Sequence, residues 1–138
     1  MPEHPCQMKM KFAEMFLKKD SDFDLNEIDR ISDINVLKDI AQNDCDYRIR
    51  LKAVGRIFDD GFLSDVAYND SNRKVKIQAV RNIKSQTLLE DISKNHSDCH
   101  IRVKAIKKVK DKAFLEGLLK KESNKHVKKA MLERISQI

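Results

Sequence analysis

The chain repeats itself at a fixed interval of 26 residues. Four blocks that begin at Asn43, Asn69, Asn95 and Lys121 align without gaps, and the same apolar columns return in each. Four of these columns are Ile49, Val75, Ile101, Val127; Ala53, Ala79, Ala105, Met131; Val54, Val80, Ile106, Leu132; and Ile57, Ile83, Val109, Ile135. A short repeat cannot bury its own apolar side, so such units predict an array in which neighbours cover one another.

The spacing of apolar residues within a block is helical. Ile49, Ala53, Val54 and Ile57 stand at i, i+4, i+5 and i+8, which is one face of a helix and not the alternation of a strand. Good N-cap residues precede two helices in each block: Asp33, Asp46, Asp59, Asn72, Ser85, Asp98, Asp111 and Asn124. We therefore predict long helices near 46–58, 72–84, 98–110 and 124–137, and short helices near 34–42, 60–68, 86–94 and 112–121.

The rest of the chain fits one all-α domain. Both prolines, Pro2 and Pro5, fall at the start, so we expect a disordered tail over 1–6. An amphipathic opening helix is predicted over 7–18, and a degenerate repeat, with a weak long helix near 21–31, over about 19–42. Clear repeats cover 43–68, 69–94 and 95–120, and a half repeat covers 121–138. Residues 7–138 are thus expected to form a single right-handed α-solenoid of two-helix units.

The blocks resemble the short HEAT-like repeats of the phycobilisome-lyase type. The resemblance is carried by an acid in the turn between helices and a cation six residues later, as in Asp44 with Arg50 and Asp70 with Lys76. The third and fourth blocks depart, with His96 beside Arg102 and Glu122 beside Lys128, and the 26-residue period is shorter than the ~40–47 usual for HEAT arrays. The resemblance implies stacked helix pairs whose long helices line a concave face.

The cation column also has a structural interpretation. Steps of ~100° per residue place Arg50 in the middle of the apolar arc of its helix. A charge there must be paired or reach solvent, since an unpaired buried charge is costly. An acid in the adjoining turn is the natural partner. Arg50, Lys76, Arg102 and Lys128 are therefore expected to link repeats and not to bind ligand.

Charge is uneven along the chain. Residues 1–68 carry a net charge of −4 and residues 69–138 a net charge of +10, which add to the +6 of the whole. Basic side chains fall on the helix arc opposite the apolar one. The difference in net charge between the two halves of the chain indicates an acidic partner. The candidate partner-binding residues are Arg48, Lys52, Arg56, Lys74, Arg81, Lys104, Lys107 and Lys108.

These features favour a non-enzymatic protein-interaction scaffold that presents a basic groove to an acidic protein. The alternative is non-specific binding of nucleic acid or another polyanion through the same face. Base stacking is not expected to contribute, because the chain has no Trp and only two Tyr. A lyase-like or accessory enzyme role is a third, weaker alternative, since a shared repeat type transfers no activity.

No catalytic, cofactor or metal site is predicted. His96, Cys99 and His100 are residue types that can bind a metal ion. The cap at Asp98 falls between the two histidines, however, so we interpret the histidines as a solvent-exposed pair. Three widely spaced cysteines describe no disulfide framework, and no apolar run of ~18 residues or leader is visible. A reducing, cytoplasmic location is the expectation.

Overall fold

The computed structural model describes residues 25–138. The tail expected at 1–6, the opening helix expected at 7–18 and the start of the degenerate repeat lie outside the described residues. The described part is all-helical, with nine helices and no strand. The helices are α3 (Leu25–Ile28), α4 (Ile34–Asn43), α5 (Tyr47–Gly55), α6 (Asp60–Asn69), α7 (Arg73–Asn82), α8 (Gln86–Asn95), α9 (Cys99–Ile106), α10 (Lys112–Leu119) and α11 (Lys125–Gln137).

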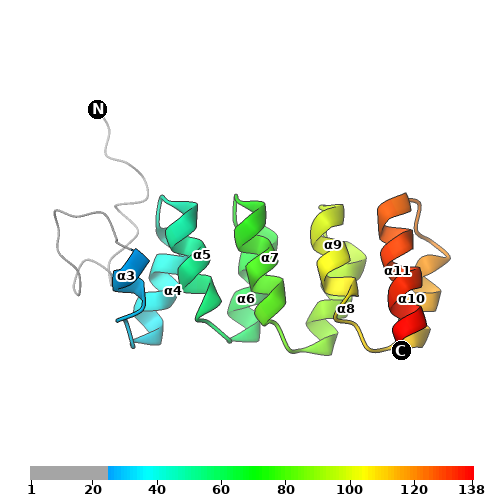
Figure 1. The fold of residues 1–138 in the computed structure, drawn as a ribbon, viewed down its shortest axis with the longest axis horizontal. Coiled ribbons are helices and arrows are strands. Elements are labelled where there is room, and N and C mark those ends of the chain that lie inside the picture. The colour runs from blue at the N-terminus through cyan, green and yellow to red at the C-terminus, as the bar shows by residue number, and fades with distance from the viewer. Residues whose placement is uncertain (1–24) are drawn as a thin grey trace.

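The helices pack as successive antiparallel pairs set side by side in chain order (Figure 1). The pairs are α4 with α5, α6 with α7, α8 with α9, and α10 with α11. Helix α5 also packs on α7, α7 on α9, and α9 on α11. We call α5, α7, α9 and α11 the front layer, as they face the viewer in Figure 1, and α4, α6, α8 and α10 the back layer. The core lies between the two layers.

All eight predicted N-cap residues cap a helix. Each of Asp33, Asp46, Asp59, Asn72, Ser85, Asp98, Asp111 and Asn124 accepts a hydrogen bond from a backbone N–H of the first turn that follows it. These bonds satisfy donors that have no partner inside the helix. The predicted boundaries between helices are confirmed at their N-terminal ends.

The predicted contrast between long and short helices is wrong for most of the chain. Helices α5, α7 and α9 have 9, 10 and 8 residues, whereas α4, α6 and α8 have 10 each, and only α11, with 13, is long. Helices α5, α7 and α9 end before the last apolar residue of the predicted helix. These residues are Ile57, Ile83 and Val109. Ile83, for example, is extended at φ −71°, ψ 130°. Its side chain is still fully buried, so periodicity alone could not show that the helix had ended.

The start of the described chain also differs from expectation. The helix predicted to reach residue 31 ends at Ile28, and a turn follows in which Arg30 N donates to Glu27 O and Ile31 N donates to Ile28 O. None of the described helices has the length and apolar character needed to cross a bilayer.

The repeated apolar columns form the core. Val54, Val80 and Ile106 are fully buried, as are Ile57, Ile83 and Val109. Leu132 belongs to the first of these columns but is 56% exposed, because no described helix packs on the outer side of α11. The members of this column in the earlier units are therefore buried by the helix pair that follows each of them.

Candidate interaction face

The two layers differ in charge. Helices α5, α7 and α9 hold no acidic residue, and Glu133 on α11 is the one acid within the front-layer helices. The Lys and Arg residues of these helices are Arg48, Arg50, Lys52, Arg73, Lys74, Lys76, Arg81, Arg102, Lys104, Lys125, Lys128, Lys129 and Arg134. The back-layer helices carry the acids Asp39, Asp60, Asp65, Glu90, Asp91 and Glu116 with only Lys38, Lys94 and Lys112. Positive and negative charges are thus segregated by layer. The comparison of net charge between residues 1–68 and 69–138 showed this only in part.

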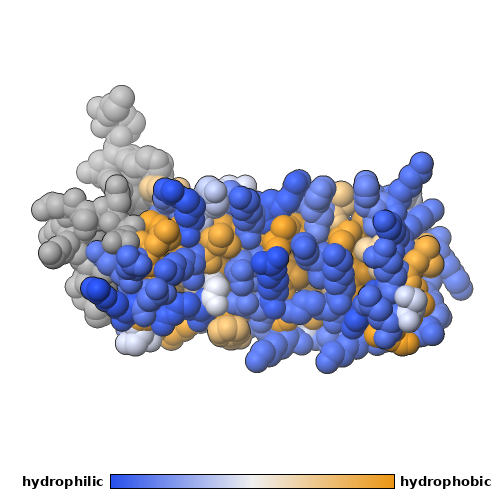
Figure 2. Space-filling model, in the orientation of Figure 1, coloured by the Kyte–Doolittle hydropathy of each residue, from blue (hydrophilic) through white to orange (hydrophobic). Residues whose placement is uncertain are grey.

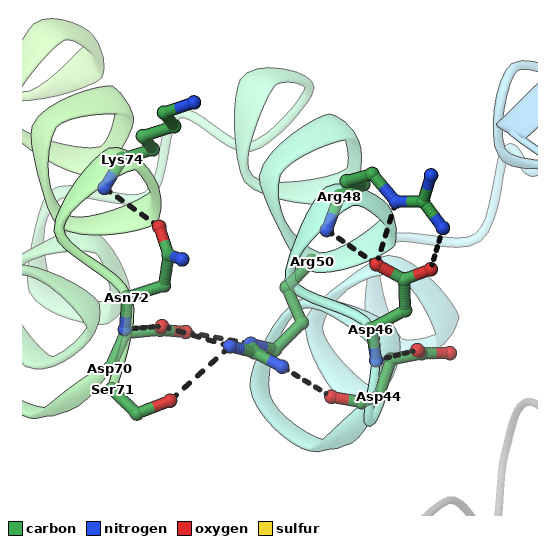
Figure 3. Close-up of polar contacts among 8 residues, drawn as sticks. All are labelled: Asp44, Asp46, Arg48, Arg50, Asp70, Ser71, Asn72 and Lys74. Carbon is green, nitrogen blue, oxygen red and sulfur yellow. Dashed lines mark hydrogen bonds and ion pairs between the residues drawn. The ribbon is translucent and has the colours of Figure 1, made fainter.

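Figure 2 shows the front layer as a mainly hydrophilic surface with hydrophobic patches among the hydrophilic residues. Two of the predicted partner-binding residues on it are already paired with acids. Arg48 Nη2 lies 2.8 Å from Asp46 Oδ2 (Figure 3), and Lys52 Nζ lies 3.0 Å from Asp29 Oδ2. The hydrogen bond from Arg48 lowers the pKa of Asp46 and raises that of Arg48.

Two further predicted residues, Arg56 and Lys108, bond to backbone carbonyls at the end of an earlier helix, α3 and α7 respectively. Arg56 Nη1 donates to Ile28 O. Lys108 Nζ donates to Val80 O at 2.9 Å, to Arg81 O at 2.6 Å and to Ile83 O at 2.5 Å. Burial lowers the pKa of Lys108. Both cations thereby cap the C-terminal end of a neighbouring helix, where backbone carbonyls lack partners and a positive charge is favoured.

A related bond to the end of a preceding helix, or to the turn just after it, occurs in every described unit, and it was not predicted from the sequence. Asn82 Nδ2 donates to Val54 O, Gly55 O and Ile57 O at 3.0–3.2 Å, and Arg134 Nε donates to Val109 O at 2.8 Å. Residues 56, 82, 108 and 134 form one column, and every member is an N–H donor long enough to reach a neighbouring carbonyl. That shared chemistry was the signal available in the sequence.

The remaining four predicted residues, Lys74, Arg81, Lys104 and Lys107, form no ion pair with an acid among residues 25–138. Lys74 Nζ lies 6.0 Å from the centroid of the Tyr47 ring and points away from the polar contacts below it (Figure 3). Lys74, Arg81 and Lys107 are exposed, and Lys104 is half-buried. These side chains supply available positive charge at the centre of the front layer.

Two members of the predicted cation column, Arg50 and Arg102, link units through pairs that cross the unit boundary. Lys76 and Lys128 form no such ion pair among residues 25–138, so the prediction is confirmed for only half of the column. Arg50 Nε lies 3.0 Å from Asp70 Oδ2 in the next unit, while Arg50 Nη1 donates to the backbone oxygen of Asp44 at 2.7 Å (Figure 3). Arg102 pairs in the same way with Glu122 and also donates to Ser93 O at 3.1 Å. In both pairs, the acid lies 20 residues after the cation, in the turn between the two helices of the next unit.

His96 takes the place of this acid in the third unit, and its predicted exposure is wrong. The ring is 5% exposed and stacks on Tyr68, with 5.0 Å between centroids. Its Nε2 lies 2.7 Å from Ala67 O, and its Nδ1 accepts from Asp98 N at 3.0 Å. The ring is therefore the Nε2–H tautomer that bridges two units. Its partner in the expected pair, His100, is exposed.

One group among the described residues brings three metal-ligand types together: Asp98, Cys99 and His100, with ligand atoms within 4.8 Å of one another. This group contains Asp98 in place of the His96 considered from the sequence, because the His96 side chain is buried. The carboxylate of Asp98 is already engaged, since Oδ2 accepts from Arg73 Nε at 2.8 Å and Oδ1 from His100 N at 2.9 Å. A cation would compete with these bonds and with the positive charge of Arg73, so we assign no metal site.

Comparison with known proteins adds no family. No protein-family model matches the chain, and neither the curated proteins nor the solved structures contain a match.

Proposed function

We propose that the protein is a non-enzymatic interaction scaffold whose front layer binds an acidic segment of a partner protein. One observation carries this proposal. Four cations lie on the neighbouring helices α7 and α9 or at the C-cap of α9, and none forms an ion pair with an acid of the described chain: Lys74, Arg81, Lys104 and Lys107. Natural surfaces usually intersperse charges of both signs, so a one-signed layer attracts ligands of opposite charge.

The proposed scaffold is a HEAT-like α-solenoid of two-helix units. The repeated sequence columns, the helix pairs in chain order and the links between units support it. Such an array displays one face of each unit along a continuous surface. We propose no catalytic step and no cofactor, and we place the scaffold in the cytoplasm on the basis of its cysteine pattern.

The second candidate is a polyanion-binding protein that contacts phosphates through the same cations. The net charge of +6 favours it. Its weakness is the scarcity of stacking platforms within residues 25–138. Both tyrosines are half-buried, Tyr68 Oη donates to Asp91 Oδ2 at 2.6 Å, and Phe58 is the one exposed aromatic ring there. The acidic protein segment therefore remains the better-supported ligand.

A charge-reversal experiment tests the proposal. The variant Lys74→Glu/Arg81→Glu/Lys107→Glu alters the front layer, and Lys94→Glu/Lys112→Glu/Lys120→Glu makes the same change in net charge on and beside the back layer. The probes are a fluorescent dodecaglutamate peptide and random-sequence duplex DNA, titrated at low and physiological salt. We expect the front variant to bind the peptide at least about tenfold more weakly than the wild type, and the back variant to bind it nearly as well.

Three results would count against the proposal. Equal weakening by both variants would mean that net charge, and not the front layer, attracts the peptide. Tight, steeply salt-dependent binding of DNA in preference to the peptide would favour the polyanion candidate. Absence of peptide binding to the wild type at low salt would reject the acidic ligand. Circular dichroism of each variant checks that the helices are retained.

A further inference from the structure

Two helices of the front layer carry a similar three-residue arrangement, with an aliphatic side chain between two polar ones, of which both on α7 and one on α9 are Lys or Arg. On α7, the aliphatic Ile77 lies between Lys74, three residues before it, and Arg81, four residues after it. At the same spacing, Val103 on α9 lies between His100 and Lys107. Residues three and four apart are neighbours on a helix surface, so each aliphatic side chain is flanked on both sides along the helix axis.

Ile77 and Val103 are both half-buried. They pack against the core but retain exposed surface, unlike Val75 and Ile101, which are fully buried two positions earlier. Each is therefore a small apolar patch within a basic surface, which phosphate groups would not exploit. An apolar side chain of a ligand would bury surface there.

The third member of the column differs in its charges. Leu51 on α5 is half-buried in the same way, but it lies between Arg48, whose charge is paired with Asp46, and Gly55. Leu51 is thus an apolar patch without the available positive charges. It offers a matched control inside the same protein.

The distance between successive front helices limits the ligand's conformation. Packed helices lie about 8–10 Å apart. A polyproline II segment has three residues per turn and a rise of ~3.1 Å, so every third side chain points the same way at intervals of ~9 Å. A segment that crosses α7 and α9 in this conformation can set apolar side chains on Ile77 and Val103 and turn its other side chains toward the cations.

We infer that the front layer recognises an extended acidic segment with an aliphatic residue at every third position, anchored on Ile77 and Val103 and paired with Lys74, Arg81 and Lys107. This inference rests on the proposed function and specifies its ligand. It replaces attraction by charge alone with a required spacing. No acid within α7 or α9 opposes the carboxylates of such a segment.

Three synthetic dodecapeptides test the inference at low and physiological salt by fluorescence anisotropy. The first repeats Glu-Glu-Leu four times, the second has the same composition with its four leucines consecutive, and the third is dodecaglutamate. We expect the patterned peptide to bind the wild-type protein about tenfold more tightly than its permuted isomer. This comparison requires no variant and so does not depend on the folding of one.

Variants then locate the anchors. We expect Ile77→Ala/Val103→Ala to bind the patterned peptide no better than the permuted one while its affinity for dodecaglutamate stays unchanged. Leu51→Ala, the matched control, retains the full preference. Alanine is used because it favours the helix, and the urea midpoint of each variant is measured first.

The outcomes separate this inference from the proposed function. Equal affinity of the wild type for the patterned and permuted peptides, or a full preference that survives Ile77→Ala/Val103→Ala, would overturn the inference and leave the charge-based proposal standing. Failure of all three peptides to bind at low salt would overturn both. Preferential binding of random duplex DNA over every peptide would also overturn both, in favour of the polyanion candidate.

Discussion

Arg50 and Asp70 form a two-bond ion pair across the boundary between successive helix pairs. Arg50 Nε and Nη2 lie 3.0 and 3.2 Å from the two carboxylate oxygens of Asp70. The side chains are only 10% and 5% exposed. Asp70 also accepts from Asn72 N at 2.8 Å, so the carboxylate joins the preceding helix α5 to the turn that starts α7. A forked guanidinium and a planar carboxylate fix both distance and orientation, which sets how one pair stacks on the next.

Removal of Arg50 should be strongly destabilising. We expect Arg50→Met to lower the free energy of unfolding by about 3 kcal/mol, since it leaves the carboxylate of Asp70 buried without a cation. Urea unfolding followed by circular dichroism measures the change. The double variant Arg50→Met/Asp70→Asn should recover part of the loss, because the introduced amide keeps an oxygen for the Asn72 backbone N–H but carries no charge. Lys128→Met, in the same column but exposed, should change stability by less than about 0.5 kcal/mol.

The turn residue and the preceding cation are expected to be coupled in the third unit as well. Its boundary has Lys76 and His96 where the others have Arg with Asp or Glu. His96→Asp alone should destabilise the protein by about 1–3 kcal/mol, because a carboxylate would replace the donor that faces Ala67 O. Lys76→Arg/His96→Asp should be more stable than His96→Asp, because the new arginine can form the pair seen between Arg50 and Asp70. A double-mutant cycle measures the coupling, and additive effects would show that the third boundary does not accept this pair.

Local features of the fold could be predicted from sequence, and contacts between units could not. N-caps depend on one side chain and the backbone two or three residues away, so Asp46 or Asn124 identifies its helix start directly. The end of α7 at Asn82 depends on a neighbouring unit, since Lys108 supplies the donors that replace the helical ladder there. Periodicity continues through the turn because Ile83 stays buried, and the prediction therefore extended the helix too far.

The sequence predicted that the candidate face carries basic residues, but it could not predict which of those side chains are exposed and which are bonded within the protein. The helical wheel placed basic residues on one arc, yet it treated Arg56 and Arg81 alike. Their difference is three-dimensional: Arg56 reaches a carbonyl of the preceding unit, while Arg81 remains exposed. The burial of His96 was likewise hidden, because its two bonds join residues from different units.

Lys107 and Lys108 are adjacent lysines that should respond differently to substitution. Lys108→Met removes three charge-assisted bonds to the end of α7 and should lower the free energy of unfolding by about 2 kcal/mol. Lys107→Met should stay within about 0.5 kcal/mol, because its side chain is exposed and unbonded to any described acid. Thermal and urea unfolding of the two variants provide the comparison. Equal losses would contradict the capping role of Lys108.

Asp98 should contribute stability that disappears in acid. Burial favours its neutral form, but the bonds from Arg73 and from the His100 amide outweigh this and lower its pKa from the usual 3.8. A folded-state pKa below the unfolded one means that the stabilisation is present above about pH 4 and is lost as the pH falls through the lowered pKa. Asp98→Asn keeps a capping oxygen and removes the charge. At pH 7 it should cost at most about 1 kcal/mol, because Arg73 is largely exposed.

The measurement is the melting temperature of the wild type and Asp98→Asn from about pH 7 down to about pH 2.5. The difference between them should shrink steadily below about pH 4. A constant difference across this range would mean that Asp98 stabilises α9 only as a cap and not through its charge.

Ile106 and Leu132 occupy one sequence column in different environments, so they test whether a following helix pair supplies the burial. Ile106 is fully buried against the next pair, whereas Leu132 is 56% exposed. Ile106→Ala should cost about 2–4 kcal/mol, since it removes buried methylenes and leaves a cavity in the core. Leu132→Ala should cost less than about 1 kcal/mol, because little of its surface leaves water on folding. Urea unfolding of both variants decides the matter, and a loss at Leu132 as large as that at Ile106 would show that α11 buries this side chain against something outside the described residues.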